Sequence, residues 1–127
     1  MAGTVVQTNA KCHTMRKLTL AWTSTSGGAA TCDTTHVSGH IHRFCAIPST
    51  SAIPTSNYDV VLNDSDGLDI LMGLGANLKA TSNANIVPIL TNGTAGNSAL
   101  VAVEGVLSLA VSSAGNVKSG QIILYYQ

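Results

Sequence analysis

Histidine and cysteine residues concentrate in the first third of the chain, where their side chains could bind a transition metal. The candidate ligands are His36, His40 and His42, with Cys12, His13, Cys32 and Cys45 as further members of the set. Imidazole and thiolate are good ligands for zinc and related metals. The spacing matches no zinc signature, because the Cys-x-x-Cys pair and the helical His-Glu-x-x-His motif are both absent. We therefore favour exposed or interface histidines on a strand. If they line a subunit contact, they would make that contact pH-sensitive below about pH 6.5.

A second candidate site is acidic and consists of Asp64, Asp66 and Asp69. Clustered carboxylates are typical calcium ligands, and Asp64-Ser65-Asp66-Gly67 opens like a calcium loop. An EF-hand needs a bidentate Glu downstream, and the chain has a single Glu, Glu104. Aspartate also caps helices and stabilises turns through its side-chain oxygens. The preferred interpretation is a capped turn, with Asp64 or Asp66 preceding the turn that contains residues 68–71.

No other pattern indicates catalysis. The chain lacks a Gly-x-Ser-x-Gly elbow and a phosphate-binding loop, and its close pairs of acids lie in the turn just described. We expect a protein that is not an enzyme and that has no cofactor.

The elements that must position these residues are strands. Tyr58, Val60 and Leu62 alternate with more polar neighbours, and alternation over residues 101–111 is longer still. Extended segments are expected at residues 3–8, 12–25, 34–47, 58–63, 85–91, 101–111 and 119–126. Residues 67–78 are compatible with one short helix, and Ala114-Gly115-Asn116 predicts a terminal hairpin between the last two strands.

These segments predict an all-β domain, an antiparallel β-sandwich or jelly-roll-like barrel of about seven or eight strands with at most one short helix. The 127 residues fit a single domain spanning 1–127, with an extended N-terminal arm at residues 1–10. Three cysteines without paired spacing predict reduced, mostly buried thiols. No signal peptide or membrane span is expected, so synthesis in the cytoplasm and no contact with a membrane are predicted.

Charge is scarce and balanced, with six basic and six acidic residues and 9% charged residues in all. The basic residues are scattered along the sequence: Lys11, Arg16, Lys17, Arg43, Lys79 and Lys118. This scatter argues against nucleic acid as the ligand, because phosphate binding needs clustered cations. A net charge near zero favours association with other protein subunits.

Two segments resemble small structural proteins of tailed bacteriophages. The first runs from Ile53 to Leu71 and contains a Pro-Thr-x-x-Tyr-Asp strand followed by an Asp-x-x-Gly-x-Asp turn. The second comprises residues 106–120 and the final strand, Gln-Ile-Ile-Leu-Tyr-Tyr, at 121–126. The resemblance covers residues 53–127, and the Cys32–Cys45 region lies outside it.

The resemblance implies a virion component, most specifically a capsid decoration or cement protein on the capsid surface of particles made in the host cytoplasm. Its implied partners are the major capsid protein and further copies of itself, with a homotrimer favoured. The alternative is a minor tail, head-tail or head-fibre component that binds a receptor or glycan. The expected contacts are the N-terminal segment, residues 23–35 and residues 48–55, together with these side chains: Val5, Val6, Pro48, Ile53, Pro54, Tyr125 and Tyr126.

Overall fold

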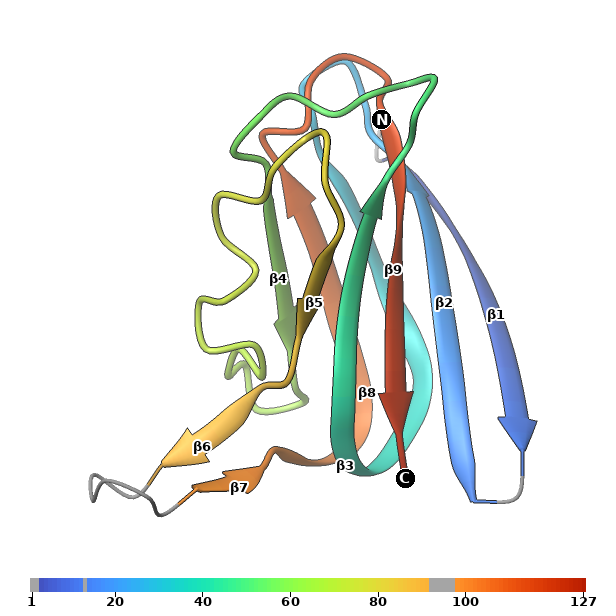
Figure 1. The fold of residues 1–127 in the computed structure, drawn as a ribbon. Coiled ribbons are helices and arrows are strands. Elements are labelled where there is room, and N and C mark those ends of the chain that lie inside the picture. The colour runs from blue at the N-terminus through green and yellow to red at the C-terminus, as the bar shows by residue number, and fades with distance from the viewer. Residues whose placement is uncertain (1–2, 13, 92–97) are drawn as a thin grey trace.

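The chain folds into an antiparallel all-β structure, seen in a computed structural model that describes residues 3–12, 14–91 and 98–127 (Figure 1). The described residues contain nine strands and no helix. The strands are β1 (Thr4–Cys12), β2 (Met15–Thr23), β3 (Ala30–Pro48), β4 (Asp59–Asn63), β5 (Ala84–Ile86), β6 (Ile89–Thr91), β7 (Ser98–Leu100), β8 (Ala102–Ser112) and β9 (Ser119–Tyr126). The fold class predicted from alternation and turn residues is confirmed.

The long strand β3 converts one seven-stranded sheet into two layers. The strand order is β1-β2-β9-β3-β8-β4, and β5 also pairs with β3. Residues 30–40 of β3 pair with β8, whereas residues 41–48 pair with β9. The first half of β3 therefore belongs to a layer with β8 and β4, and the second half to a layer with β9, β2 and β1 (Figure 1). β6 and β7 form a separate two-stranded sheet.

The corner of β3 depends on Gly39. Its φ of +126° lies in a region that L side chains rarely adopt, and an added Cβ would come within 2.4 Å of the Gln127 carbonyl oxygen. Next to it, His40 and Gln127 exchange two backbone hydrogen bonds of 2.8 and 3.0 Å. Ile41 then donates its N–H to Val101. The C-terminal residue thus closes the gap between the two layers at this corner.

The core lies between the layers and is built from the alternating strand positions. Leu18, Leu20 and Trp22 of β2 are buried, and so are Leu107 and Leu109 of β8. Trp22 packs against Tyr58 across the core, with ring centroids 5.8 Å apart. A single cluster of buried residues includes all of these side chains.

A bulge in β3 between Asp33 and His36 is stabilised by side chains that replace backbone partners. Thr34 is buried, and its hydroxyl accepts the N–H of Leu107 at 3.0 Å. From the other side, the Gln7 amide donates to the Asp33 carbonyl at 2.8 Å and accepts from Thr35 N–H at 3.1 Å. Gln7 thereby links the edge strand β1 to β3.

Residues 64–78 form consecutive turns that cover the outer edge of β4, so the short helix allowed at 67–78 does not form. Val60 donates its N–H to the Gly75 carbonyl, and Leu62 accepts from Ile70 N–H. A Cβ at Gly75 would meet the Val60 carbonyl oxygen at 2.2 Å. Glycine at this position lets the chain run close enough to pair with β4.

Two further expectations are wrong. β8 and β9 do not form a terminal hairpin, because the residues between them carry the chain from one layer to the other and the two strands pair with different neighbours. Residues 4–10 are not an extended arm, because they belong to β1 and pair with β2 along their length. Turn residues predict where the chain reverses direction. They do not predict which strand the next strand pairs with.

Candidate functional site

Three loops meet at one end of the two-layered structure, and we call this surface the loop end. They comprise residues 24–29, 49–58 and 113–118, and the described N-terminal residues lie beside them (Figure 1). Strands of both layers finish here, so segments far apart in the sequence become neighbours. The regions 23–35 and 48–55, expected to make contacts, lie partly or wholly at this end.

Ser24 connects the first and third loops. This buried side chain donates its hydroxyl to the Gly115 carbonyl at 2.7 Å and accepts Lys118 N–H at 2.9 Å. Its own N–H donates to the Lys118 carbonyl. A hydroxyl that is both donor and acceptor satisfies two loop backbone groups that would otherwise be unpaired.

The second loop is held in the same way by backbone hydrogen bonds. Thr55 N–H donates to the Ala114 carbonyl at 2.8 Å, and Ser119 N–H donates to the Ala52 carbonyl at 3.0 Å. Ala114 N–H in turn donates to Gly28. The loop end is therefore a cross-linked surface in which each loop restrains the next.

Three shallow grooves of about 510, 410 and 190 Å³ lie along this end and the adjoining face of β1, β2 and β9. The largest is bordered by Val6, Ala21, Ile47 and Gln121, and shares Thr4 with the second groove. No charged side chain lines any of the three, since their walls are hydroxyl, amide and apolar groups. Such walls suit a polar but uncharged protein surface better than a phosphate or metal ligand.

The structure divides the side chains expected to make contacts into three groups by their exposure. Val6 and Ile53 are exposed, and each borders a groove. Val5 and Tyr125 are half-buried. The remaining three, Pro48, Pro54 and Tyr126, are buried in the free chain, so their side chains cannot serve as primary anchors.

Sequence reasoning missed the outward positions of β2, β3 and β9 that form the largest groove. Ala21, Gln121 and Ile47 lie opposite one another across three strands. They alternate with core residues, so strand periodicity gives their outward direction. Their adjacency follows only from strand order, which the sequence does not specify.

The acidic segment forms a set of turns, which is the interpretation that the sequence favoured. Asp64 accepts the N–H groups of Asp66 and Leu68 at 2.9 and 3.0 Å. Asp69 accepts those of Leu71 and Gly73 at 3.0 and 2.9 Å. These carboxylates stabilise the covering of β4, although they cap turns and not a helix.

The candidate histidines do not converge. His36 lies near the bulge of β3, whereas His40 and His42 lie at and just beyond its corner. The described residues contain no group of three or more His, Cys, Asp or Glu placed to hold a metal ion. His13 and the Cys12 side chain lie outside what the structure describes. Cys32 and Cys45 are free thiols, and burial raises the pKa of Cys32, with a further contribution from Asp33.

His36 instead pairs with Glu104 on the outer face of the β3–β8 layer, with 2.9 Å between Nε2 and Oε1. The second carboxylate oxygen of Glu104 accepts a hydrogen bond from Ser38. This hydrogen bond, together with His36, lowers the pKa of Glu104. Both members of the ion pair are exposed, so its contribution to stability is small.

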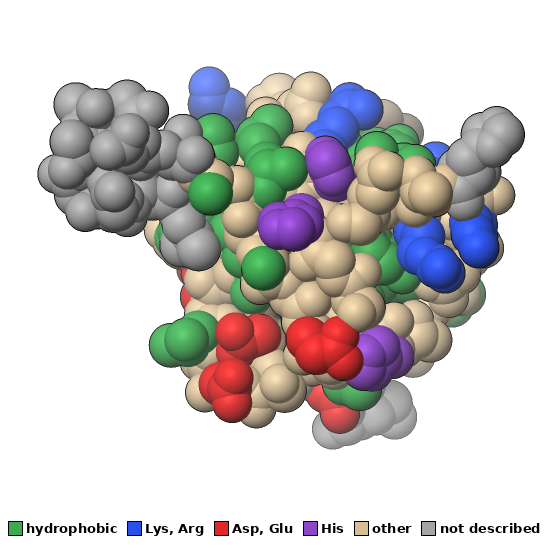
Figure 2. Space-filling view, turned by 90° about the horizontal axis from the view of Figure 1, so that it is seen from below, with side chains coloured by type: hydrophobic (Ala, Val, Ile, Leu, Met, Phe, Trp, Pro, Cys, Tyr) green, Lys and Arg blue, Asp and Glu red, His purple; other side chains and the backbone are tan. Residues whose placement is uncertain are grey.

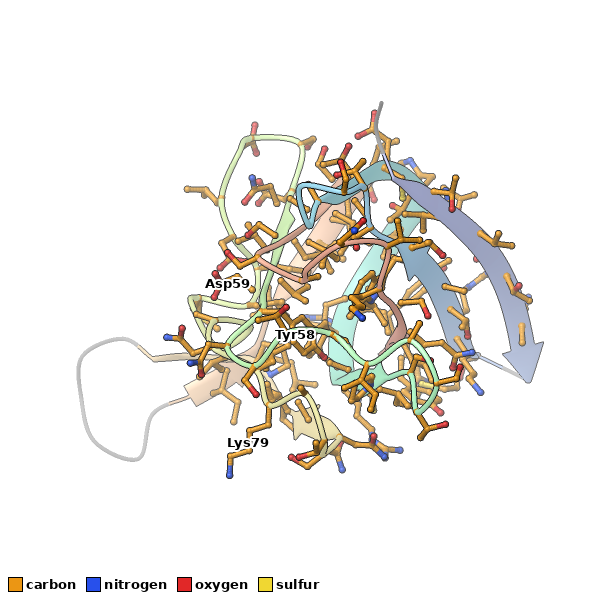
Figure 3. All side chains as sticks on the ribbon, turned by 90° about the horizontal axis from the view of Figure 1, so that it is seen from above. Tyr58, Asp59 and Lys79 are labelled. Atoms are coloured by element: carbon orange, nitrogen blue, oxygen red, sulfur yellow. The ribbon has the colours of Figure 1, made fainter. Side chains whose placement is uncertain are left out.

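Tyr58, Asp59 and Lys79 are titratable residues near the second loop, and their positions decide whether they could act together as an acid–base site. Seen from the loop end, Tyr58 lies near the middle of the molecule, whereas Lys79 extends outward and away from Asp59 (Figure 3). Asp59 accepts Asn77 N–H at 2.8 Å, and burial raises the pKa of Tyr58. The three side chains therefore do not form an acid–base site.

No protein-family model matches the chain, and no curated protein is found to be similar to it. The description of the fold and of the loop end is therefore based only on the structure.

Proposed function

We propose that this protein is a non-enzymatic structural component of a virion, specifically a capsid decoration protein that binds the major capsid protein through its loop end. The observation that carries the proposal is the continuous run of uncharged grooves along three interlocked loops. The resemblance of residues 53–127 to phage structural proteins supplies the biological setting. Self-association is part of the proposal.

Decoration uses many weak contacts at once. A protein that bridges several capsid subunits gains avidity because each contact after the first is intramolecular. Shallow grooves are sufficient for such a role, and the hydrogen bonds between the loops keep them in shape before binding. Pre-organisation reduces the ordering entropy lost on association.

The alternative of a receptor- or glycan-binding fibre module requires an aromatic ring that is free to stack. The aromatic side chains Trp22, Phe44, Tyr58 and Tyr126 are buried. Tyr125 is half-buried and has Lys17 and Arg43 beside its ring. The aromatic residues therefore favour decoration over carbohydrate stacking.

The test uses capsids of the phage that encodes this chain, assembled without it. We expect the purified chain to bind expanded capsids to a saturating copy number fixed by the lattice. Val6→Glu should weaken this binding by about tenfold, because it places a charge in the largest groove. Leu68→Glu is the matched control, since Leu68 is 67% exposed and Val6 is 65% exposed, and Leu68 lies in the turn after β4.

Failure of the wild-type chain to bind expanded capsids would exclude decoration. Binding of only a few copies per particle would favour the tail or head-tail alternative. Equal binding by the Val6→Glu and Leu68→Glu variants would exclude the loop end as the contact.

A further inference from the structure

The end of the molecule opposite the loops carries most of the charge, and we call it the charged end. It is formed by the β1–β2 hairpin, the corner of β3, the end of β4 and its turn, and the beginning of β8. In the view onto this end, Lys and Arg side chains lie along the upper and right-hand edges, and Asp and Glu side chains lie toward the lower edge (Figure 2). A chain with balanced charge in sequence is therefore polarised in space.

The basic half contains four of the six cations of the chain: Lys11, Arg16, Lys17 and Arg43. Lys11 and Arg16 are paired residues of the β1–β2 hairpin. Lys17 and Arg43 lie on either side of Tyr125 in the strand register, with Nζ and Cζ 5.8 and 5.3 Å from its ring centroid. These residues are scattered in sequence, and hairpin formation and the return of β3 bring them together.

The side chains of the basic half are partly fixed in position. Arg43 donates its Nε–H to Asn85 at 2.8 Å, which leaves the terminal guanidinium nitrogens available to a partner. The aromatic ring between Lys17 and Arg43 attracts both cations. Among the described residues the ion pair within 4.0 Å is His36–Glu104, so these four cations lack a carboxylate in the free chain.

The acidic half consists of Asp64, Asp66 and Glu104. The turn that contains the first two lies against β8, since a Cβ at Gly105 would approach Ser65 Oγ to 3.3 Å. Asp64 holds this turn through its two backbone hydrogen bonds, and Asp66 is exposed at its tip. Glu104 is fixed by Ser38 and His36 on the neighbouring strand.

We infer that the charged end binds a second copy of this chain across a twofold axis. Rotation by 180° about an axis that lies in the plane of this end, along the line between its two halves, places the basic half of each copy on the acidic half of the other. The dimer then contains two equivalent contacts between a basic half and an acidic half, whereas contact between like halves would be repulsive. The expected assembly of the free protein is thus a dimer in place of the trimer expected from the resemblance.

This inference extends the self-association part of the proposed function, but its contact does not include the loop end. The dimer leaves both sets of grooves open, at opposite ends of the pair. The experiment is therefore done on free protein without capsids, so that its outcome is independent of capsid binding.

Sedimentation velocity at low and high salt tests the contact. We expect the wild-type chain to dimerise at about 0.05 M NaCl and to dissociate at about 1 M, where charges are screened beyond about 3 Å. The double variants Lys17→Glu/Arg43→Glu and Asp66→Lys/Glu104→Lys should each be monomeric. An equimolar mixture of the two should dimerise again, because every reversed charge then meets its complement.

Lys79→Glu/Lys118→Glu is the matched control, since it reverses two cations that lie outside the charged end, and it should dimerise like the wild type. A monomeric wild-type chain, a dimer insensitive to salt, or a mixture that stays monomeric would overturn the inference. So would an assembly larger than a dimer. Binding of a short DNA duplex by a monomeric chain, lost in Lys17→Glu/Arg43→Glu, would instead assign the basic half to nucleic acid.

Discussion

The two ends of the molecule differ in how they are held together and in what they present to a partner. At the loop end, backbone hydrogen bonds connect three loops, and the grooves have no charged walls. The charged end is formed by strand ends, the corner of β3 and the turn after β4, and it carries four basic and three acidic side chains on different sides. The two ends therefore suit different kinds of contact: the loop end suits a close uncharged contact, and the charged end suits an electrostatic contact.

The difference also explains why a nearly neutral chain can form specific contacts. Strand pairing collects seven of its twelve charged side chains at one end, whereas others, such as Lys79 and Lys118, lie elsewhere. The grooves of the loop end have no charged walls, which in the proposed decoration role would limit repulsion between copies bound side by side. A mutation at one end should leave the function of the other intact, and the following predictions depend on this separation.

The largest expected effect is at the β3 corner of the charged end. Gly39→Ala should lower the free energy of unfolding by about 3 kcal/mol, because it combines an unfavourable φ with a clash against the Gln127 carbonyl. Gly67→Ala is the control, as Gly67 also has a positive φ of 84° but open space around it. The control should lose about 1 kcal/mol. Urea unfolding measures both values, and equal losses would show that the corner is not sterically restricted.

At the loop end, Ser24→Ala should cost about 2 kcal/mol, because it leaves the Gly115 carbonyl and the Lys118 N–H without their partner. The exposed Ser26 provides the matched control, and Ser26→Ala should change stability little. Capsid binding should also weaken in Ser24→Ala, since the grooves lose a cross-link, while dimerisation remains. A variant that loses dimerisation instead would contradict the independence of the two ends.

Salt separates the two contacts without any mutation. Raising NaCl from about 0.1 to 1 M should weaken dimerisation by about tenfold or more and change capsid affinity by less than about threefold, because only the charged end depends on exposed ions. Titrations of the same protein at both salt concentrations provide the comparison. If capsid binding were the more salt-sensitive of the two, the assignment of surfaces would be reversed.

The smallest expected effect concerns Glu104. Its pKa is lowered from 4.5, first by the Ser38 hydrogen bond, so its favourable contribution is present above pH 4.5 and is lost as the pH falls through the folded-state value. Melting temperatures between about pH 3 and 6 should therefore decline less steeply in Ser38→Ala than in the wild type. Superimposable profiles would mean that Ser38 does not stabilise the carboxylate.

Much of the fold follows from local pattern, because alternation and turn residues act over a few positions. The final strand begins and ends at the residues predicted for it from the preceding turn, Ser119 and Tyr126. The acidic turn at Asp64 forms because aspartate accepts neighbouring N–H groups whatever the tertiary structure. These features need no knowledge of the rest of the chain.

Properties that depend on strand order could not be predicted. Alternation across residues 34–47 gives no sign that the strand folds over at Gly39, because extended residues lie on both sides of the corner. The predicted hairpin of the last two strands fails for the same reason. Both the groove across β2, β9 and β3 and the clustering of four cations arise from pairings between distant segments.

The most direct test of the central claim is a cryo-electron microscopy reconstruction of the virion in which this chain is located and oriented. We expect density for the chain at regular lattice positions on the outer shell, with the loops at residues 24–29, 49–58 and 113–118 against capsid subunits. The charged end should be directed away from them. Absence of the chain from the shell would contradict the proposed function. A chain bound with its charged end against the capsid would contradict the assignment of the loop end as the binding surface.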